Sequence, residues 1–423
     1  MTERANPVSA PPPPAGWRPG FTLIELMIAI AIGLAMMLAL LALFASSSRS
    51  NNEISKMNGL IENGRFAIQL LQSDLAVAGF WGTYLPQFSD LSPTSTPPDD
   101  VPMGVPDPCA NYNNWGSSPN TDSTVNPPRD YKREIIGIPV QAYGYQATPA
   151  ACTSVVTNQL ANTDILVVRH AESCVPGTGN CDPDMTGKLY FQSKLCPTQL
   201  GSYVLSTTGG STAFDRQDGH CNSALLADKR KFISHIYYVR TYAIEAPTTA
   251  KPTGDGIPTL VRSDFDCQVD ATTNSCIANT LTHQAPIPLI EGIEGFRVEL
   301  GIDNLSKTGG AINYGAAVDW QGTPPSPSNR GDGMPDSFVH CTSACTADQL
   351  MNVTAVKLYI LVRAREPTPG YKDGKFYRLG TANTLCAKLL PTMTSCNLDP
   401  RYKRHVFSTT IRLNNVSFRR ETP

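Results

Sequence analysis

Residues 20–45 have the sequence GFTLIELMIAIAIGLAMMLALLALFA, in which Glu25 is the single charged residue. About 25 residues of helix are enough to cross a bilayer, whereas the apolar core of a secretory signal has only ~7–15 residues and ends in a small-residue cleavage site. We therefore expect residues 21–45 to form a membrane-spanning helix, which decides how the rest of the chain is organised.

Glu25 is the polar group that this span must accommodate. A carboxylate inside a membrane helix costs ~2.5–3.5 kcal/mol on insertion scales, so it needs a partner. Cleavage after Gly20 would give Phe21 a free α-amino group, a cation at neutral pH, and a neighbouring helix shifted along its axis could bring that amine to Glu25. The alternative is an ordinary anchor whose Glu side chain extends to the headgroups. The Gly20-Phe21 junction close to Glu25 favours the pairing.

The segment Gly20-Phe21-Thr22-Leu23-Ile24-Glu25-Leu26 resembles the class III signal of type IV prepilins and of the related type II secretion pseudopilins. The resemblance implies that a membrane-embedded prepilin peptidase cuts after Gly20 and that the new N-terminal Phe21 is methylated. The signal is specific for the superfamily and does not distinguish its members.

The rest of the chain has the composition of a folded domain. With 423 residues, of which 41% are hydrophobic, it can bury a substantial core. Its formal net charge of −2 gives no overall positive field for a polyanion. Nucleic acid is therefore not an expected partner.

Twelve cysteines follow the apolar span, and none forms a C-x-x-C pair. This pattern indicates disulfides in an oxidising compartment, so the globular part is expected outside the cytoplasm. Zinc ligation is the alternative, with His340, Cys341 and Cys345 as its best candidates. Neighbours in the sequence suggest the pairs Cys174–Cys181, Cys196–Cys221, Cys267–Cys276, Cys341–Cys345 and Cys386–Cys396, which leaves Cys109 with Cys152.

Two segments flank the span. Residues 1–20 are rich in proline and form a leader that should stay in the cytoplasm until it is removed, an orientation that Arg18 supports. The polar residues 46–51 mark the exit from the membrane. From residue 46 the helix is expected to continue as an amphipathic segment, which covers residues 46–82 and stops at its glycine-rich end.

Apolar or small residues recur in this continuation with alternating three- and four-residue spacing, which predicts one buried helical face. Its members are Ile54, Met57, Ile61, Gly64, Ile68, Leu71, Leu75 and Ala78. Another helix or a sheet of the same chain could cover this face. A coiled coil would need larger residues than Gly64 and Ala78 in its seam, so we expect the sheet.

The remaining sequence predicts a β-rich head. Residues 83–130 are rich in Pro, Ser, Asn, Asp and Thr and predict a long irregular connection. Within residues 131–423, apolar residues from Phe296 to Ile302 alternate with polar ones, the period of a strand with one face in water. The runs with strand character are 164–170, 232–244, 258–262, 295–302, 353–365 and 405–413. The expected fold is α+β: a long N-terminal helix packed on a mainly antiparallel sheet with long disulfide-bearing loops.

This order of elements is similar to that of type IV pilins, and several blocks resemble the PilW-type minor pilins. The blocks are residues 62–67 (ENGRFA), 78–82 (AGFWG), 164–169 (DILVVR), 289–294 (LIEGIE) and 404–414 (RHVFSTTIRLN). The resemblance implies a type IV pilin-like fold, with other minor pilins, a tip adhesin and the major pilin as partners. The long leader and the extended cysteine-bearing loops depart from the family pattern.

Short catalytic motifs are absent from the sequence, which contains no H-E-x-x-H, G-x-S-x-G, P-loop or G-x-G-x-x-G, so no enzymatic activity is expected. The segment 329–336 could offer oxygen ligands to Ca²⁺ from Asn329, Asp332 and Asp336. Two carboxylates are few for such a site, so a turn is the preferred interpretation and no cofactor is expected.

Basic residues gather near the C-terminus and suggest a cationic strip that could bind DNA. A solvated sheet face is favoured, because no aromatic residues are interleaved with them. These residues are Arg401, Lys403, Arg404, Arg412, Arg419 and Arg420.

The sequence thus predicts a minor pilin that initiates or caps type IV pilus assembly as part of a tip complex. Before assembly it would lie in the bacterial inner membrane with its globular part in the periplasm, and afterwards in the extracellular pilus, at the tip. The alternatives are a type II secretion pseudopilin and an adhesion or DNA-binding module at the pilus tip.

Overall fold

The computed structural model describes residues 20–86, 101–115, 130–145, 147, 149–207, 213–245, 254–313, 318–321, 326–343, 345–381, 383–386 and 398–420. The chain divides into two compact units, Met1–Ser55 and Lys56–Pro423. Residues 1–19 of the expected leader and much of the proline-rich connection lie outside the described residues.

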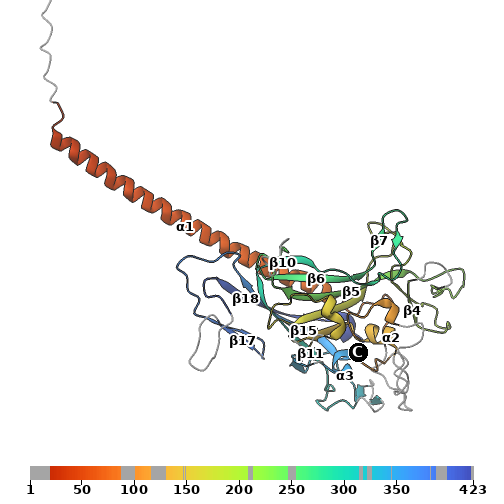
Figure 1. The fold of residues 1–423 in the computed structure, drawn as a ribbon. Coiled ribbons are helices and arrows are strands. Elements are labelled where there is room, and N and C mark those ends of the chain that lie inside the picture. Colours follow the sequence, from red (N-terminus) through yellow and green to blue (C-terminus); the bar gives the residue numbers. More distant parts are fainter. Residues whose placement is uncertain are drawn as a thin grey trace, which may run out of the picture. The chain divides into compact units, whose positions relative to one another are not determined.

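The helix α1 runs from Leu23 to Ala76 and therefore includes nearly all of the expected span (Figure 1). In the first unit its large apolar side chains are exposed, from Leu23 to Phe44. Among the described residues, α1 is long and apolar enough to cross a membrane, and its most apolar window is entirely unburied. An apolar surface of this extent requires a bilayer or other helices to cover it.

The helix α1 ends at Ala76, six residues before the end at residue 82 that the sequence predicts. The last turn is closed by the hydrogen bond from the Ala78 amide to the Leu75 carbonyl (3.1 Å). Gly79 then adopts a φ of +73°, in the left-handed region that favours glycine after a helix. The helix ends here because the chain turns at Gly79 and its amide bonds to the Arg169 carbonyl (3.0 Å).

In the second unit, the last turns of α1 pack against sheet residues of the same unit. Leu60, Gly64, Ala67, Leu71 and Leu75 are buried on this face. Four members of the predicted stripe, Gly64, Leu71, Leu75 and Ala78, are buried, and Ile61 and Ile68 are partly buried against the same core. Leu60 and Ala67 are buried in addition to the predicted positions. The expectation that a sheet covers the helix is confirmed.

The larger sheet has β5 (Lys229–Arg240) at its centre. Because β5 is long, its first residues pair with β3 while its second part pairs with β2 and β6. The other strands are β1 (Val140–Tyr143), β2 (Ile165–Ala171), β3 (Tyr190–Ser193), β4 (Tyr203–Ser206), β6 (Thr259–Asp266), β9 (Thr282–His283) and β10 (Ile287–Glu291).

The second sheet has the order β14-β11-β15-β18, from β14 (Ser337–Val339), β11 (Ile293–Ile302), β15 (Val353–Arg363) and β18 (Arg404–Arg412). Figure 1 labels β11, β15 and β18. All pairings in both sheets are antiparallel. Apolar residues of both sheets and of α1 form one shared core. The α+β fold class is thus confirmed.

Shorter elements complete the second unit. Two-stranded ribbons pair β7 (Val269–Asp270) with β8 (Ser275–Cys276), β12 (Asp319–Gln321) with β13 (Ser326–Ser328), and β16 (Phe376–Leu379) with β17 (Asn383–Cys386). The helices are η1 (Tyr112–Trp115), α2 (Tyr131–Gly137), η2 (Ala150–Ser154), α3 (Ala347–Met351) and α4 (Asn414–Ser417). Sequence periodicity did not predict these helices, because the longest of them has only seven residues.

The predicted water-facing side of β11 is wrong. Arg297 and Glu299 alternate with apolar residues, yet they are only 2% and 1% exposed. Arg297 is neutralised by Asp164, and Glu299 accepts hydrogen bonds from Thr381. Both partners lie far away in the sequence, so the alternation of β11 could not indicate that its polar face is covered.

Candidate assembly site

The N-terminal residues Gly20 and Phe21 precede α1, and Phe21 is 87% exposed. Thr22 is the N-cap of the helix. Its hydroxyl accepts a hydrogen bond from the Glu25 amide (3.3 Å), and the Glu25 carboxylate in turn accepts one from the Thr22 amide (3.4 Å). This reciprocal pair is a capping box, which satisfies two of the free amides at the helix start.

Glu25 therefore has a local partner in the isolated chain. Its Oε2 also accepts a hydrogen bond from the Thr22 hydroxyl (3.3 Å), and all of these contacts are exposed. Neutral donors hold a carboxylate less strongly than a cation does. A protonated α-amine would thus be the stronger partner for Glu25, and the Gly20–Phe21 bond is the one whose cleavage would create it.

Buried ion pairs connect distant parts of the second unit. Arg297 on β11 donates to Asp164 (3.0 Å), which also accepts from the Val298 amide (2.9 Å) and lies 3.0 Å from His340 Nε2. Asp164 precedes β2, so this cluster joins the two sheets. His340 is thus engaged within the protein, and Cys341 is bonded to Cys345.

A second buried cluster involves the C-terminal basic residues. The Arg404 guanidinium donates to Glu294 (2.5 Å) and to Asp373 (3.1 Å), and its side chain is fully buried. Arg420 bonds to Asp303 (3.3 Å), and Arg419 donates to the Met351 carbonyl. Three of the six basic residues therefore lie inside the head, which removes them from any surface strip.

The three calcium candidates each hydrogen-bond to other groups of the protein. Asp336 Oδ2 accepts the amides of Asn304 (2.9 Å) and Leu305 (2.7 Å). Asp332 Oδ1 accepts the Met334 amide (2.9 Å), and Asn329 exchanges hydrogen bonds with Asn313. Each side chain thus stabilises a separate turn.

The structure joins cysteines in five of the six suggested pairs. These are Cys109–Cys152, Cys174–Cys181, Cys196–Cys221, Cys267–Cys276 and Cys341–Cys345, with sequence separations from 4 to 43. The remaining pair, Cys386–Cys396, lies outside the described side chains.

A cluster that the sequence analysis did not predict lies where α1 meets the larger sheet. Asp74 on α1 contacts His170 on β2 and His235 on β5. Burial opposes the ionisation of Asp74, but the hydrogen bonds from the two histidines outweigh it and hold the pKa of this carboxyl below its usual range. The sequence contained no motif for this cluster, since its members are far apart in the chain.

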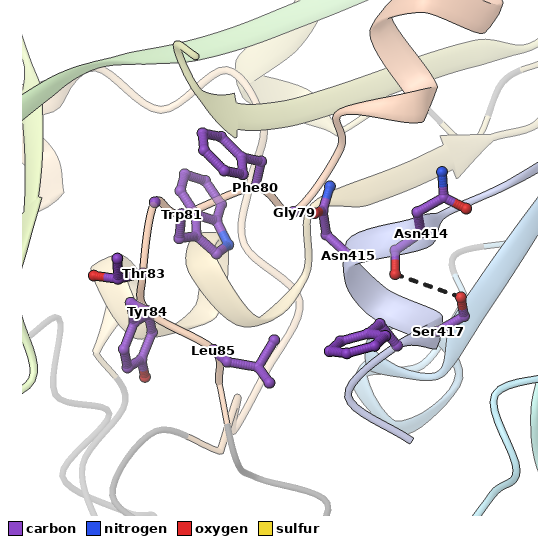
Figure 2. Close-up of a pocket in the computed structure, with 11 residues that line it drawn as sticks. Gly79, Phe80, Trp81, Thr83, Tyr84, Leu85, Asn414, Asn415 and Ser417 are labelled. Atoms are coloured by element: carbon purple, nitrogen blue, oxygen red, sulfur yellow. Dashed lines mark hydrogen bonds between the residues drawn. The ribbon is translucent and has the colours of Figure 1, made fainter. Parts of the chain in front are cut away.

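A surface pocket of about 460 Å³ lies between the turn after α1 and α4. Figure 2 shows Gly79 to Leu85 on one side and Asn414, Asn415 and Ser417 on the other. The Asn415 amide donates to the Ala78 carbonyl (3.2 Å) and holds the two sides together. The described lining residues provide aromatic rings, amides and hydroxyls.

Two family models match this chain, one at the start of α1 and one in the head. Residues 18–41 match the family model described as the prokaryotic N-terminal methylation motif. Residues 236–415 match the model of the family PilW, described as type IV pilus-assembly protein W. The chain is a type IV pilin-family protein with a PilW domain. The resemblance stated from the sequence is thus confirmed.

One solved structure similar to this PilW-type pilin is a type IV-like pilin from Thermus thermophilus. It is 10% identical, the match covers 84% of this chain and 96% of that chain, and the TM-score is 0.32. A search of curated proteins returned no match.

Most residues of the buried ion pairs lie in the region that matches the PilW model. Glu294, Arg297 and Arg404 all lie in the matched region. Arg404 pairs with Glu294 and Asp373, whereas Arg297 pairs with Asp164, which precedes that region. Their roles are architectural, because each charged group is paired inside the head. Membership of a pilin family likewise points to a structural, non-enzymatic protein.

Proposed function

We propose that this PilW-type pilin initiates or caps type IV pilus assembly as a minor subunit of a tip complex, after prepilin peptidase cleaves it behind Gly20. The observation that carries the proposal is the exposed apolar surface of α1 up to residue 45, in which Glu25 is the single charge, next to the Gly20–Phe21 junction. No chemistry beyond processing and methylation of Phe21 is needed for this role.

The mechanism is an exchange of partners. In the membrane, lipid covers the apolar side chains of α1, and Thr22 caps Glu25. In the filament, neighbouring helices replace lipid, and the amine of Phe21 in an adjoining subunit replaces Thr22 as the partner of Glu25. The charge-assisted contact favours the filament over the membrane-bound monomer.

The apolar helix and the cysteines of the head also indicate where the protein lies before and after assembly. Before assembly the protein would lie in the inner membrane with its head in the periplasm, where the cysteines of the head can form disulfides. After assembly the head would lie at the tip of the extracellular pilus. We infer other minor pilins, the major pilin and a tip adhesin as partners, and prepilin peptidase as the processing enzyme.

The test is piliation of a deletion strain that carries the Glu25→Ala variant. The expected result is normal loss of the leader without surface fibres or twitching. Ile28→Ala, an exposed apolar position in the next turn, is the matched control and should restore fibres. Normal fibres in the Glu25→Ala strain would refute the proposed mechanism.

A type II secretion pseudopilin is the second candidate, because it shares the processing signal. The PilW match favours the pilus. The deletion phenotype separates the two functions: loss of twitching supports the pilus, whereas loss of exoprotein secretion with intact pili supports the pseudopilus.

A further inference from the structure

The cluster of Asp74, His170 and His235 has the composition of a transition-metal site. His170 Nε2 lies 3.1 Å from Asp74 Oδ1, and His235 Nδ1 lies 2.9 Å from Asp74 Oδ2. One ligand atom from each of the three residues lies within 4.8 Å of the others. Two imidazoles and a carboxylate are ligands that Zn²⁺ accepts in proteins.

The outer ring nitrogens also have partners. His170 Nδ1 lies 2.9 Å from the Ala171 carbonyl oxygen. His235 Nε2 lies 3.6 Å from Asp264 Oδ1, and Arg262 holds that carboxylate in place. A backbone carbonyl and a carboxylate are the usual acceptors for the outer N–H groups of metal-binding histidines.

Counting donors shows why a cation fits between the inner nitrogens. A neutral imidazole has one N–H, yet the His170 ring has an oxygen acceptor within hydrogen-bond distance of both nitrogens. The inner nitrogen of His235 lies against Asp74, and its outer nitrogen lies 3.6 Å from Asp264. When the outer nitrogens carry the protons, the inner nitrogens direct lone pairs towards Asp74. Asp74 has the hydroxyl of Tyr237 as a further donor (2.9 Å). A metal ion would take the place of the two imidazole donors that contact Asp74 in this structure.

We propose that Asp74, His170 and His235 bind one divalent transition-metal ion of the Zn²⁺ type. The site is independent of the proposed function in pilus assembly. Water would complete the coordination.

The distances require little movement. Ligands placed about 2.1 Å from a tetrahedral Zn²⁺ are about 3.4 Å from one another. The two imidazole–carboxylate separations of 3.1 and 2.9 Å are a few tenths of an ångström shorter than that. The three side chains are 9–14% exposed.

The position of the site gives it a mechanical role. Asp74 is near the end of α1, whereas His170 and His235 lie on adjacent strands of the larger sheet. A metal ion would therefore attach the last turn of α1 to β2 and β5 with coordinate bonds. Bound metal would therefore make it harder to separate the last turn of α1 from β2 and β5.

The experiment uses the full chain in detergent after exhaustive treatment with a chelator. We expect Zn²⁺ to bind with a stoichiometry of one per chain in calorimetry and to raise the melting temperature, while Mg²⁺ at the same concentration does neither. Co²⁺ should give the visible absorption of a tetrahedral site. No binding of Zn²⁺ or Co²⁺ to the folded protein would overturn the proposal.

Two variants locate the ion. His170→Gln and His235→Gln should each weaken Zn²⁺ binding by at least about 100-fold. His220→Gln, which replaces an exposed histidine, is the matched control and should bind as the parent does. Tyr237→Phe keeps all three ligands and should also bind. If the histidine variants fail to fold, the Co²⁺ spectrum of Asp74→Asn provides the second measurement. Unchanged binding or spectra in variants of this cluster would refute the assignment.

Discussion

At the scale of single residues, two glycines of α1 differ only in what lies beside them. A Cβ added at Gly64 would overlap the ring of Phe407 on β18, whereas Gly59 has no heavy atom within 4 Å of that position. Gly64 is buried, because β18 approaches the helix backbone directly at this point. The two positions therefore separate the effect of packing from that of helix propensity.

Gly64→Ala should lower the stability of the head, since the cost of overpacking, ~1–3 kcal/mol, exceeds the gain in helix propensity. Gly59→Ala should raise stability by ~0.5–1 kcal/mol. Thermal unfolding of the two detergent-solubilised variants beside the parent measures the difference. Equal melting temperatures for the two variants would contradict the close packing of Phe407 on Gly64.

A second residue-scale effect concerns His283, which is buried beside the hydroxyls of Ser234 and Ser263 (both 3.4 Å). Burial, with a smaller contribution from the charge of Arg169, lowers the pKa of His283 from 6.5 to about 3. At a pH between 6.5 and about 3, His283 takes up a proton in the unfolded chain but not in the folded chain. Stability must therefore fall as the pH drops below 6.5.

We expect His283 to cost roughly 2 kcal/mol of stability between pH 7 and pH 5. The measurement is the urea midpoint of the parent and of His283→Gln at the two pH values. The variant should lose less stability on acidification, while the exposed control His220→Gln should follow the parent. Parallel losses in the parent and His283→Gln would show that His283 is protonated in the folded state.

The sequence indicated only candidate residues that lie close together in the chain. Gly20, Phe21 and Glu25 could be proposed because they lie in one short segment, residues 20–25. Asp74 and His235 were not, because 161 positions separate them and only the pairing of β2 with β5 brings His170 beside His235. No local pattern carries that information.

At the scale of elements, the accuracy of each predicted strand depended on which residues pack against it. The expected strands at 164–170, 295–302 and 405–413 correspond to β2, β11 and β18 within two residues at each end. The strand expected at 232–244 begins earlier, at Lys229, because the polar residues of β5 pair with β3. Apolar runs predicted the strands, but polar residues buried by distant partners shifted their ends and faces.

Disulfides act at the same scale, and their effect should depend on the length of the loop that they close. The Cys109–Cys152 bond spans 43 positions, whereas Cys341–Cys345 spans 4. Chain entropy assigns roughly 4 kcal/mol to the first loop and roughly 2 kcal/mol to the second. Long loops gain more because the unfolded chain loses more freedom.

Replacing both Cys109 and Cys152 with serine should therefore lower the denaturant midpoint more than replacing both Cys341 and Cys345. Chemical unfolding of the two double variants under non-reducing conditions measures this difference. A smaller effect for the longer loop would show that loop entropy does not dominate in this head.

At the scale of the whole molecule, the two units have opposite surfaces. The first unit exposes apolar side chains along α1, while the second buries its apolar residues and its charged pairs in a shared interior. The first unit therefore needs an apolar surrounding, and the second is built for water. A protein that moves from a bilayer into a filament needs this combination.

The central claim is that processing behind Gly20 prepares the helix for assembly. The most direct measurement is mass spectrometry of the N-terminal peptide of this protein recovered from sheared pili. We predict a peptide that begins with N-methylated Phe21, with residues 1–20 absent. A chain in the fibres that begins at Met1, or at any residue other than Phe21, would contradict the account.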